Sequence, residues 1–450
     1  MYSLTRVLRS SVRAAASAAD GIATALIIAG SAVYIAAGPL GWFLLGSAAL
    51  TMVLAATIDR IRSSSSRTAT MSLLVIGIAV NGAVLIWARL HLDGRAFAFA
   101  GPPVLTCLSV AYLIDVYRGE AALSRPLTSM LYVVQFPVLA AGPIVRYRDF
   151  SRFHRRSDRD VTLADVTYGV RRLVIGLVKV MFVAAVLADP VDVIFALPAT
   201  KLTADAAWLA AVCFSLQIYF QFSGFADIAI GIGRFVGLRY PENFRRPYVA
   251  DSVREFWRRW AVTSITWLRD YLSLPIAGRD APSLALYANL LVGFTLIGLW
   301  LGAGSTLLIW AIYSATWLGV EAIGLDVWLD RTPAPLRHLY VLLVMIVGWV
   351  ILRSDTAAHA LLMVQTMIGM KGTWTLTAWR YLSPGLWFVL ISAILGAGPL
   401  ISWISRWRVS LDATTAAILM MIAATFVFLW KGVTLVFSGA AWRRRVEPPR

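Results

Sequence analysis

The residue types that could do chemistry are concentrated between residues 238 and 283, where the composition shifts to Arg, Trp, Asp, Glu, Asn and Pro. Carboxylates in such a segment can take part in proton transfer, and arginines can bind phosphate or carboxylate groups. The candidate substrate-binding residues in and around it are Asp227, Glu242, Asn243, Arg258, Arg259, Trp260, Arg269, Asp270 and Trp300. Charges beside hydrophobic spans mark a pathway or a site, although a cytoplasmic loop with ordinary salt bridges is the alternative interpretation.

Two helices are expected to position these side chains. On the first, Asp227 and Arg234 are seven residues apart, close enough in angle for a shared face. Pro241-Glu242-Asn243 is expected to interrupt this helix, because proline disfavours helical conformation in the residue before it. The backbone groups exposed at the break could orient a substrate, and a satisfied turn is the alternative.

The second helix is expected from Val253 to Tyr271. Its aromatic spacing predicts one stripe, which is more typical of a core or an interfacial belt than of a substrate platform. The stripe consists of Phe256, Trp260, Thr263 and Trp267. Glu255 and Arg259 are spaced as a favourable i, i+4 pair. The other charges of this helix would form structural pairs, lipid-headgroup contacts, or contacts to the phosphates of a donor or to an acceptor.

The composition of the whole chain identifies the class of protein. Of 450 residues, 59% are hydrophobic and 14% charged, and the mean hydropathy is +0.73. These values exclude a disordered chain and an ordinary soluble domain, and leave an integral membrane protein. The 41 Lys and Arg exceed the 24 Asp and Glu, which gives a net charge of +17. We assign this excess to cytoplasmic loops and expect no nucleic-acid partner, since no binding module is recognisable.

About eleven membrane crossings are expected, each of roughly 17–25 apolar residues. They fall near residues 22–38, 40–57, 71–90, 97–117, 168–188, 206–223, 284–300, 305–323, 338–353, 384–404 and 413–431. Arginines after the second crossing predict a cytoplasmic N-terminus in the cell (inner) membrane. The expected organisation is an amphipathic interfacial segment (1–21), N-terminal transmembrane helices (22–100), a core (101–323) that contains the polar belt 238–283, and C-terminal transmembrane helices with a basic tail (324–450).

The segment 128–145 does not fit a simple crossing. It is short, contains Pro137 and Gly142-Pro143, and has basic residues on both flanks. A single crossing would place one basic cluster outside the cell, whereas a re-entrant hairpin keeps both on the cytoplasmic face. Non-helical backbone is tolerated at membrane depth only when protein surrounds it or it lines a cavity. We therefore predict a re-entrant hairpin.

Several long motifs occur in one order along the chain. Tyr219 to Gly278 reads YFQFSGFADIAIGIGRFVGLRYPENFRRPYVADSVREFWRRWAVTSITWLRDYLSLPIAG. Before it come YLIDVYRG (112–119), FPVLAAGPIVRYRDF (136–150) and GLVK (176–179), and after it comes GLWLGAGSTLLIW (298–310). Over roughly residues 100–320 the chain resembles the membrane-bound O-acyltransferase (MBOAT) family. The resemblance is strongest to the bacterial branch that acetylates exported polysaccharides such as alginate or D-alanylates teichoic acids.

The resemblance implies an all-helical polytopic bundle around a central tunnel, with re-entrant segments. An acyl thioester, either acyl-CoA or an acyl-carrier protein, would enter from the cytoplasm as co-substrate, and no bound cofactor is implied. A hydroxyl or amine acceptor would enter from the outside. The implied partners are membrane lipids, this cytoplasmic donor, and an exported acyltransferase or carrier protein.

The chain departs from the family at two positions. Active members carry a histidine directly after the RRW tryptophan and another after the GLW tryptophan, and this sequence has Ala261 and Leu301 there. Histidine suits proton removal near neutral pH, which methyl and isobutyl groups cannot perform. The four histidines present lie elsewhere, His91 and His154 in expected loops, His338 near the start of a span and His359 in the following loop. The sequence thus assigns no catalytic residue, and Asp270 is the best substitute.

Two hypotheses follow from these residues. One is a group transferase by ancestry, moving an acyl group from a thioester to a hydroxyl or amine, with altered or lost chemistry. The other is a pseudoenzyme that binds acyl chains and scaffolds or regulates an export or biosynthetic complex. A lipid or acyl-chain translocator that uses the tunnel is a further alternative. Conventional histidine-dependent transfer is not expected in either case. The two cysteines, Cys107 and Cys213, lie far apart in apolar stretches, so we expect neither a disulfide framework nor a metal site.

Overall fold

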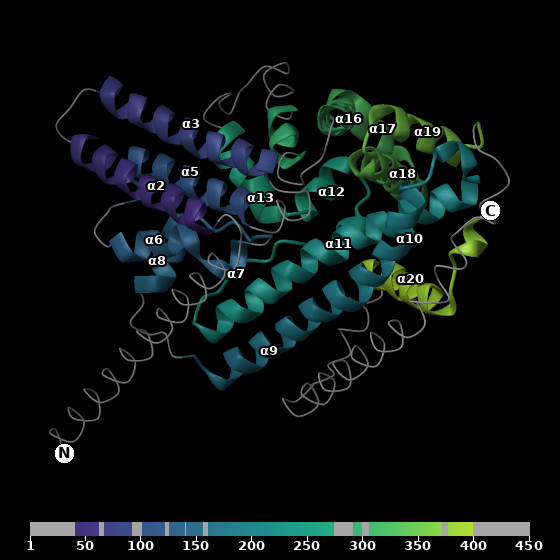
Figure 1. The fold of residues 1–450 in the computed structure, drawn as a ribbon, viewed down its shortest axis with the longest axis horizontal. Coiled ribbons are helices and arrows are strands. Elements are labelled where there is room, and N and C mark those ends of the chain that lie inside the picture. Colours follow the sequence, from purple (N-terminus) through teal and green to yellow (C-terminus); the bar gives the residue numbers. More distant parts are fainter. Residues whose placement is uncertain are drawn as a thin grey trace.

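In the computed structural model, the elements of regular secondary structure in the part of the chain that it describes are helices (Figure 1). These residues are 41–62, 67–91, 101–121, 126–139, 141–155, 161–273, 291–298, 306–370 and 377–398. The predicted all-α polytopic architecture is thereby confirmed. The expected interfacial segment 1–21, the first and last expected spans, the basic tail, Trp300 and Leu301 lie outside the described residues.

Six helical segments in the described residues are long and apolar enough to cross a membrane. They are Leu44–Arg62, Arg67–Ala88, Leu163–Phe195, Ala204–Phe235, Leu308–Arg331 and Ala334–Arg353. Each overlaps one of the expected crossings. Helix α5 (Pro102–Arg118), which covers another expected crossing, has 17 residues. The total of about eleven stays a prediction.

The N-terminal part packs three helices together. Helix α2 (Gly41–Arg62) and helix α3 (Arg67–His91) lie side by side with α5 (Figure 1). Gly77 of α3 allows this approach, because a Cβ there would lie 2.7 Å from a methyl carbon of Leu113 in α5. Helix α5 ends at Gly119, whose left-handed backbone (φ 79°) lets its N–H bond to the carbonyl of Val116.

The expected re-entrant segment forms short pieces rather than one long helix. Helix α6 (Pro126–Val134) is followed by the four-residue helix α7 (Phe136–Leu139), by non-helical residues 142–146 with a cis Gly142–Pro143 bond, and by α8 (Tyr147–Arg155). Neither α6, of nine residues, nor α7 is long enough to cross a bilayer. The buried Tyr132 hydroxyl donates to the carbonyl of Val145 (2.8 Å), which ties the two limbs of the segment together.

The centre of the molecule is an antiparallel pair of long helices. Helix α9 (Leu163–Val178) continues through a π-helical turn, η1 (Lys179–Ala184), into α10 (Ala185–Phe195), and α11 (Ala204–Phe235) runs back beside α9 (Figure 1). Two glycine pairs bring the backbones into contact. A Cβ on Gly176 would lie 2.6 Å from the Gly224 carbonyl oxygen, and one on Gly231 would lie 2.7 Å from that of Gly169. Small residues at such crossings are typical of membrane helix pairs.

The remaining helices belong to the polar belt and to the C-terminal part. In the belt lie η3 (Pro247–Val249), α12 (Val253–Arg259), α13 (Val262–Trp267) and η4 (Leu268–Ser273). The C-terminal part contains α16 (Leu307–Val320), η5 (Glu321–Leu325), α17 (Asp326–Arg331), α18 (Ala334–Arg353), α19 (Ala357–Met367), η6 (Ala378–Arg380) and α20 (Pro384–Ala397). A short 3-10 turn, η2 (Ala199–Lys201), precedes α11.

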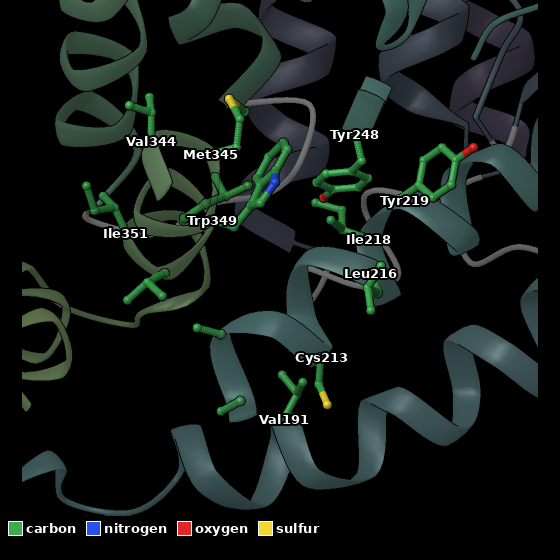
Figure 2. Packing of buried hydrophobic residues seen from close by; sticks show 14 of the residues in the cluster. Val191, Cys213, Leu216, Ile218, Tyr219, Tyr248, Val344, Met345, Trp349 and Ile351 are labelled. Atoms are coloured by element: carbon green, nitrogen blue, oxygen red, sulfur yellow. The ribbon is translucent and has the colours of Figure 1, made fainter. Parts of the chain in front are cut away.

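The buried side chains form two hydrophobic clusters. The N-terminal cluster is built on α2, α3, α5, α6 and α7, and the C-terminal cluster on α10, α12, α16, α18, α19 and α20. Helix α11 contributes to both, with residues such as Cys213 in the C-terminal cluster and Ile230 in the N-terminal one. Figure 2 shows part of the C-terminal cluster, with Tyr248 between Trp349 and Tyr219 in this view. The polar belt lies where the chain passes from one cluster to the other.

Candidate functional site

The expected single helix 253–271 is broken at Ala261, where the sequence interpretation was wrong. Helix α12 ends at Arg259, Trp260 is extended, and Ala261 has a left-handed backbone (φ 43°, ψ 50°) before α13 begins. Hydrogen bonds to an earlier segment hold the break open. Arg245 N–H donates to the Arg259 carbonyl (2.9 Å), and Val262 N–H donates to that of Asn243 (2.8 Å). These backbone bonds replace the helical ones that continuous helix geometry would require.

The break divides the expected aromatic stripe between the two clusters. Phe256 and Trp260 are buried in the C-terminal cluster, and the Trp260 ring lies 4.9 Å from that of Trp349. Trp267 instead packs against the N-terminal cluster and donates its indole N–H to the Cys107 carbonyl (3.0 Å). The stripe is therefore not one helix face. Ala261, which packs against the C-terminal cluster, lies at the point of transfer.

Asn243 holds three segments together. Its side chain is 1% exposed, and its Oδ1 atom accepts from the backbone N–H (3.1 Å) and hydroxyl (2.8 Å) of Thr263. The same hydroxyl accepts from the N–H of Ile144 (2.9 Å), which follows the cis Gly142–Pro143 bond. Asn243 and Thr263 thus connect the re-entrant segment, the non-helical stretch after α11 and the start of α13. Among the alternatives left open by the sequence, this geometry is a satisfied turn.

The helix that carries Asp227 ends earlier than expected. Helix α11 terminates at Phe235, six residues before Pro241. Gly237 adopts a left-handed backbone (φ 73°), and Leu238 N–H donates to the Gly233 carbonyl (2.7 Å). Glycine takes this conformation without a steric cost from a Cβ, so it ends the helix before the proline can act.

Asp227 is the centre of a buried charge cluster. It is 5% exposed and lies in a candidate membrane span, with its Oδ2 atom 2.7 Å from the Lys179 ammonium and its other oxygen ion-paired to Arg172. Arg172 also donates to the exposed Glu242 (2.8 Å). Arg234 faces α9 as well but pairs with Asp165 (3.0 Å) rather than with Asp227. The cluster therefore contains two acids and two bases in direct contact.

Asp270 is the centre of a second charge cluster. Its carboxylate is ion-paired to Arg146 and lies 2.9 Å from Arg269, while its backbone carbonyl accepts from Arg118 (3.3 Å). Arg118 precedes the re-entrant segment, and Arg146 follows it. Both flanks consequently lie on the same side of the bundle, as a re-entrant hairpin requires.

The remaining belt charges surround α12. The predicted Glu255–Arg259 pair is confirmed, with Arg259 Nε 2.9 Å from Glu255 Oε1, and Arg258 is exposed. A hydrogen bond with Glu255, together with burial, raises the pKa of Asp251 above its ordinary value, because two neighbouring carboxyls favour a shared proton.

The start of α12 is fixed from the C-terminal part. Glu321, 1% exposed, accepts the N–H groups of Val253 (2.6 Å) and Arg254 (2.8 Å).

The histidines lie on separate elements. His91 is the last residue of α3, and the backbone of His154 belongs to α8. His338 of α18 has its Nδ1 atom 3.1 Å from the Ala250 carbonyl oxygen. His359 lies in α19, with its ring 6.1 Å from that of Phe195. The expected loop positions of His91, His154 and His359 are wrong, because the backbone of each belongs to a helix.

Comparison with known proteins identifies the family. A sequence model of the MBOAT, membrane-bound O-acyltransferase family, matches residues 41–333. The chain belongs to this family. This match begins well before and ends after the motif region read from the sequence, so it includes α2, α3 and the Glu321 contact to α12.

Relatives of this MBOAT chain include O-acetyltransferases and D-alanyltransferases. It is 40% identical over 272 residues to a probable alginate O-acetylase, AlgI, of Azotobacter vinelandii, covering 60% of this chain and 53% of the relative. It is 33% identical over 296 residues to a peptidoglycan O-acetyltransferase of Helicobacter pylori (59% and 56% covered). A teichoic acid D-alanyltransferase of Bacillus subtilis is 27% identical over 238 residues (50% and 59% covered). The chain thus spans little more than half the length of these relatives.

The sequence interpretation did not identify four charged residues of this MBOAT site that contact its candidate residues. Arg146, Arg172, Lys179 and Glu321 each contact a candidate residue or its helix. Lys179 stands in the GLVK motif and Arg146 in the motif 136–150, so their positions in motifs that carry the family resemblance were the available signal. No sequence signal pointed from Glu321 to α12.

Proposed function

We propose that this MBOAT-family membrane protein keeps the acyltransferase scaffold without histidine-dependent acyl transfer. In this proposal it binds acyl chains and scaffolds or regulates an envelope-modifying complex in the inner membrane, with a cytoplasmic N-terminus. The observation that carries it is the environment of Ala261. This position keeps a left-handed backbone, which costs a residue with a Cβ about 1–2 kcal/mol, yet it presents only a methyl group to the aromatic cluster.

The conformation of Ala261 supports an origin from a histidine-bearing site. Asn, Asp and His are several-fold enriched among residues with a left-handed backbone, whereas Ala gains nothing from it. The backbone is fixed by the bonds of Arg245 and Val262 to the two sides of the break, so it is independent of the side chain at 261. The scaffold is therefore retained where the resemblance expects a base, and the base is absent.

The neighbouring carboxylates support the same proposal. A general base needs a lone pair directed at the acceptor proton. Asp227 contacts two cations, and so does Asp270. In both acids, each of the two carboxylate oxygens faces a cation. Neither acid is arranged as a free base.

The ligands follow from the family and from the named relatives. We propose an acyl thioester, as acyl-CoA or an acyl-carrier protein, as the cytoplasmic ligand, and a hydroxyl or amine of an envelope polymer as the acceptor class. An exported acyltransferase or carrier protein would be the partner. Within this proposal, Asn243 and Trp260 shape the site, and Arg258 and Arg269 are exposed enough to meet the donor.

Altered chemistry is the second candidate. It is favoured by the cluster of Arg146, Asp270 and Arg269. In this cluster the two arginines could hold an anionic group beside the carboxylate. Asp270 would then act on an amine acceptor or a strongly oriented one, for which proximity supplies much of the barrier reduction.

The test uses the full chain in nanodiscs with radiolabelled short-chain and long-chain acyl thioesters and candidate polymer acceptors. The variants are Asp270→Asn, the double variant Ala261→His with Leu301→His, and the matched double variant Ala261→Asn with Leu301→Asn. Asparagine has the same preference for the left-handed backbone as histidine but supplies no base.

Binding without turnover in the native chain, with turnover in the histidine variant alone, supports the non-catalytic scaffold. Turnover by the native chain that is lost in Asp270→Asn supports altered chemistry and overturns the scaffold proposal. Equal turnover in the native chain and all variants would contradict both.

A further inference from the structure

The outer face of α3 carries an open groove that neither the family nor the charge clusters account for. It has a volume of about 590 Å³ and is lined by α3 residues and by Tyr117 near the end of α5. The α3 segment is a candidate membrane span, and Met71, Val75 and Ile76 on it are 47%, 54% and 51% exposed. In a bilayer these side chains would face lipid rather than protein.

The groove changes character along the helix axis. Two adjacent rows at i, i+4 spacing line it, one of Arg67, Met71 and Val75 and the other of Thr68, Ser72 and Ile76. Both rows begin polar and end apolar over about 13 Å of helix. A phospholipid has the same order, with a polar headgroup at the interface and acyl chains that extend into the hydrocarbon.

Charge favours an anionic headgroup at the polar end. Arg67 is exposed at the first residue of α3, and no ion pair to it is found within the described residues, whereas Arg62 lies 3.9 Å from Asp59. Arg62 also lies against Gly119, so the end of α2 and the end of α5 share one side. Basic pockets beside transmembrane helices bind acidic lipid headgroups.

We propose that this groove is a binding site for one anionic glycerophospholipid. The phosphodiester lies at Arg67, with the Tyr117 hydroxyl and Ser72 beside the headgroup, and an acyl chain covers Met71, Val75 and Ile76. A free phosphate ion would leave the apolar half of the groove uncovered, so the lipid is the ligand.

The site is tested by native mass spectrometry of the full chain in detergent, titrated with phosphatidylglycerol, phosphatidylcholine or inorganic phosphate. Arg67→Gln removes the charge, and Arg331→Gln removes another exposed charge, at the end of α17, as a control. Val75→Trp fills the apolar half. Intrinsic tryptophan fluorescence and size-exclusion elution show whether each variant is folded.

The native chain should retain one phosphatidylglycerol in preference to phosphatidylcholine. Arg67→Gln should weaken phosphatidylglycerol binding about fivefold and leave phosphatidylcholine unaffected, the effect of one basic side chain at an anionic lipid surface. Val75→Trp should remove the retained lipid, and Arg331→Gln should bind as the native chain does. Equal loss in Arg67→Gln and Arg331→Gln, equal retention of both lipids, or displacement of the lipid by millimolar phosphate would overturn the proposal.

Discussion

Thr263 donates two hydrogen bonds to one oxygen of Asn243, from its backbone N–H at 3.1 Å and from its hydroxyl at 2.8 Å. Because the hydroxyl also accepts from Ile144 N–H, this pair fixes the re-entrant segment against the polar belt. A threonine and an asparagine thereby set the position at which α13 begins, directly after Ala261.

We expect Asn243→Ala to lower the free energy of unfolding by about 1–3 kcal/mol, because it leaves buried donors of Thr263 without an acceptor. Thr263→Val should cost a similar amount, and the double variant less than the two losses added together. Unfolding in mixed micelles titrated with SDS and followed by tryptophan fluorescence measures these values. Thr263→Ser keeps the hydroxyl and is the control. Full additivity would contradict a direct coupling of the two residues.

Asp227→Asn should lower the free energy of unfolding by about 3–5 kcal/mol, since it leaves Arg172 and Lys179 without their shared anion. Combining it with Lys179→Gln restores the charge balance and should recover part of the loss. The same SDS titration applies, with the exposed Asp330→Asn as the matched loss of one acid. A double variant less stable than Asp227→Asn would show that Lys179 has other partners.

Gly176→Ala should destabilise the α9–α11 pair by about 1–3 kcal/mol, because its Cβ would meet the backbone of Gly224. Gly82→Ala in α3 is the control, since no atom lies within 4 Å of a Cβ there. It should be neutral or stabilising by about 0.5–1 kcal/mol through helix propensity. Similar losses at the two glycines would mean that α9 and α11 are not in backbone contact in the bilayer.

The re-entrant geometry predicts that single cysteines at Glu120 and Arg148 are labelled from the same side of the membrane. The experiment uses a background with Cys107→Ala and Cys213→Ala, and a membrane-impermeant maleimide applied to right-side-out and inside-out vesicles. Both positions should react only in inside-out vesicles, because their basic flanks are expected in the cytoplasm. Labelling of the two positions from opposite faces would show that the segment crosses the membrane and would contradict the re-entrant hairpin.

The architecture was accessible from sequence because hydropathy over a span of 17 or more residues is a strong signal. The expected crossings 40–57, 71–90 and 338–353 all became helices of the described structure. The break at Ala261 was not accessible, since the periodicity of Phe256 and Trp260 continues into Thr263 and Trp267 as if the helix were unbroken. Only bonds from the distant residues Asn243 and Arg245 override that local preference.

The sequence singled out charged residues of the polar belt but not the residues that pair with them. Asp227 and Glu242 were singled out from composition, while Arg172, which contacts both, lay in what read as an ordinary span. Local spacing could pair Glu255 with Arg259, because both lie on one helix. It could not pair Asp270 with Arg146, because that contact depends on how the re-entrant segment folds back.

The meeting of Arg118 and Arg146 at Asp270 also sets an order of events during synthesis. The ribosome completes the re-entrant segment before it makes the polar belt, and a chain grows at about 5–20 residues per second. Asp270 and Thr263, the residues that contact its two flanks and its non-helical tip, are therefore made several seconds after the segment itself. Until then Arg146 has no Asp270 to pair with, so the contacts that fix this segment can form only after translation has passed the belt.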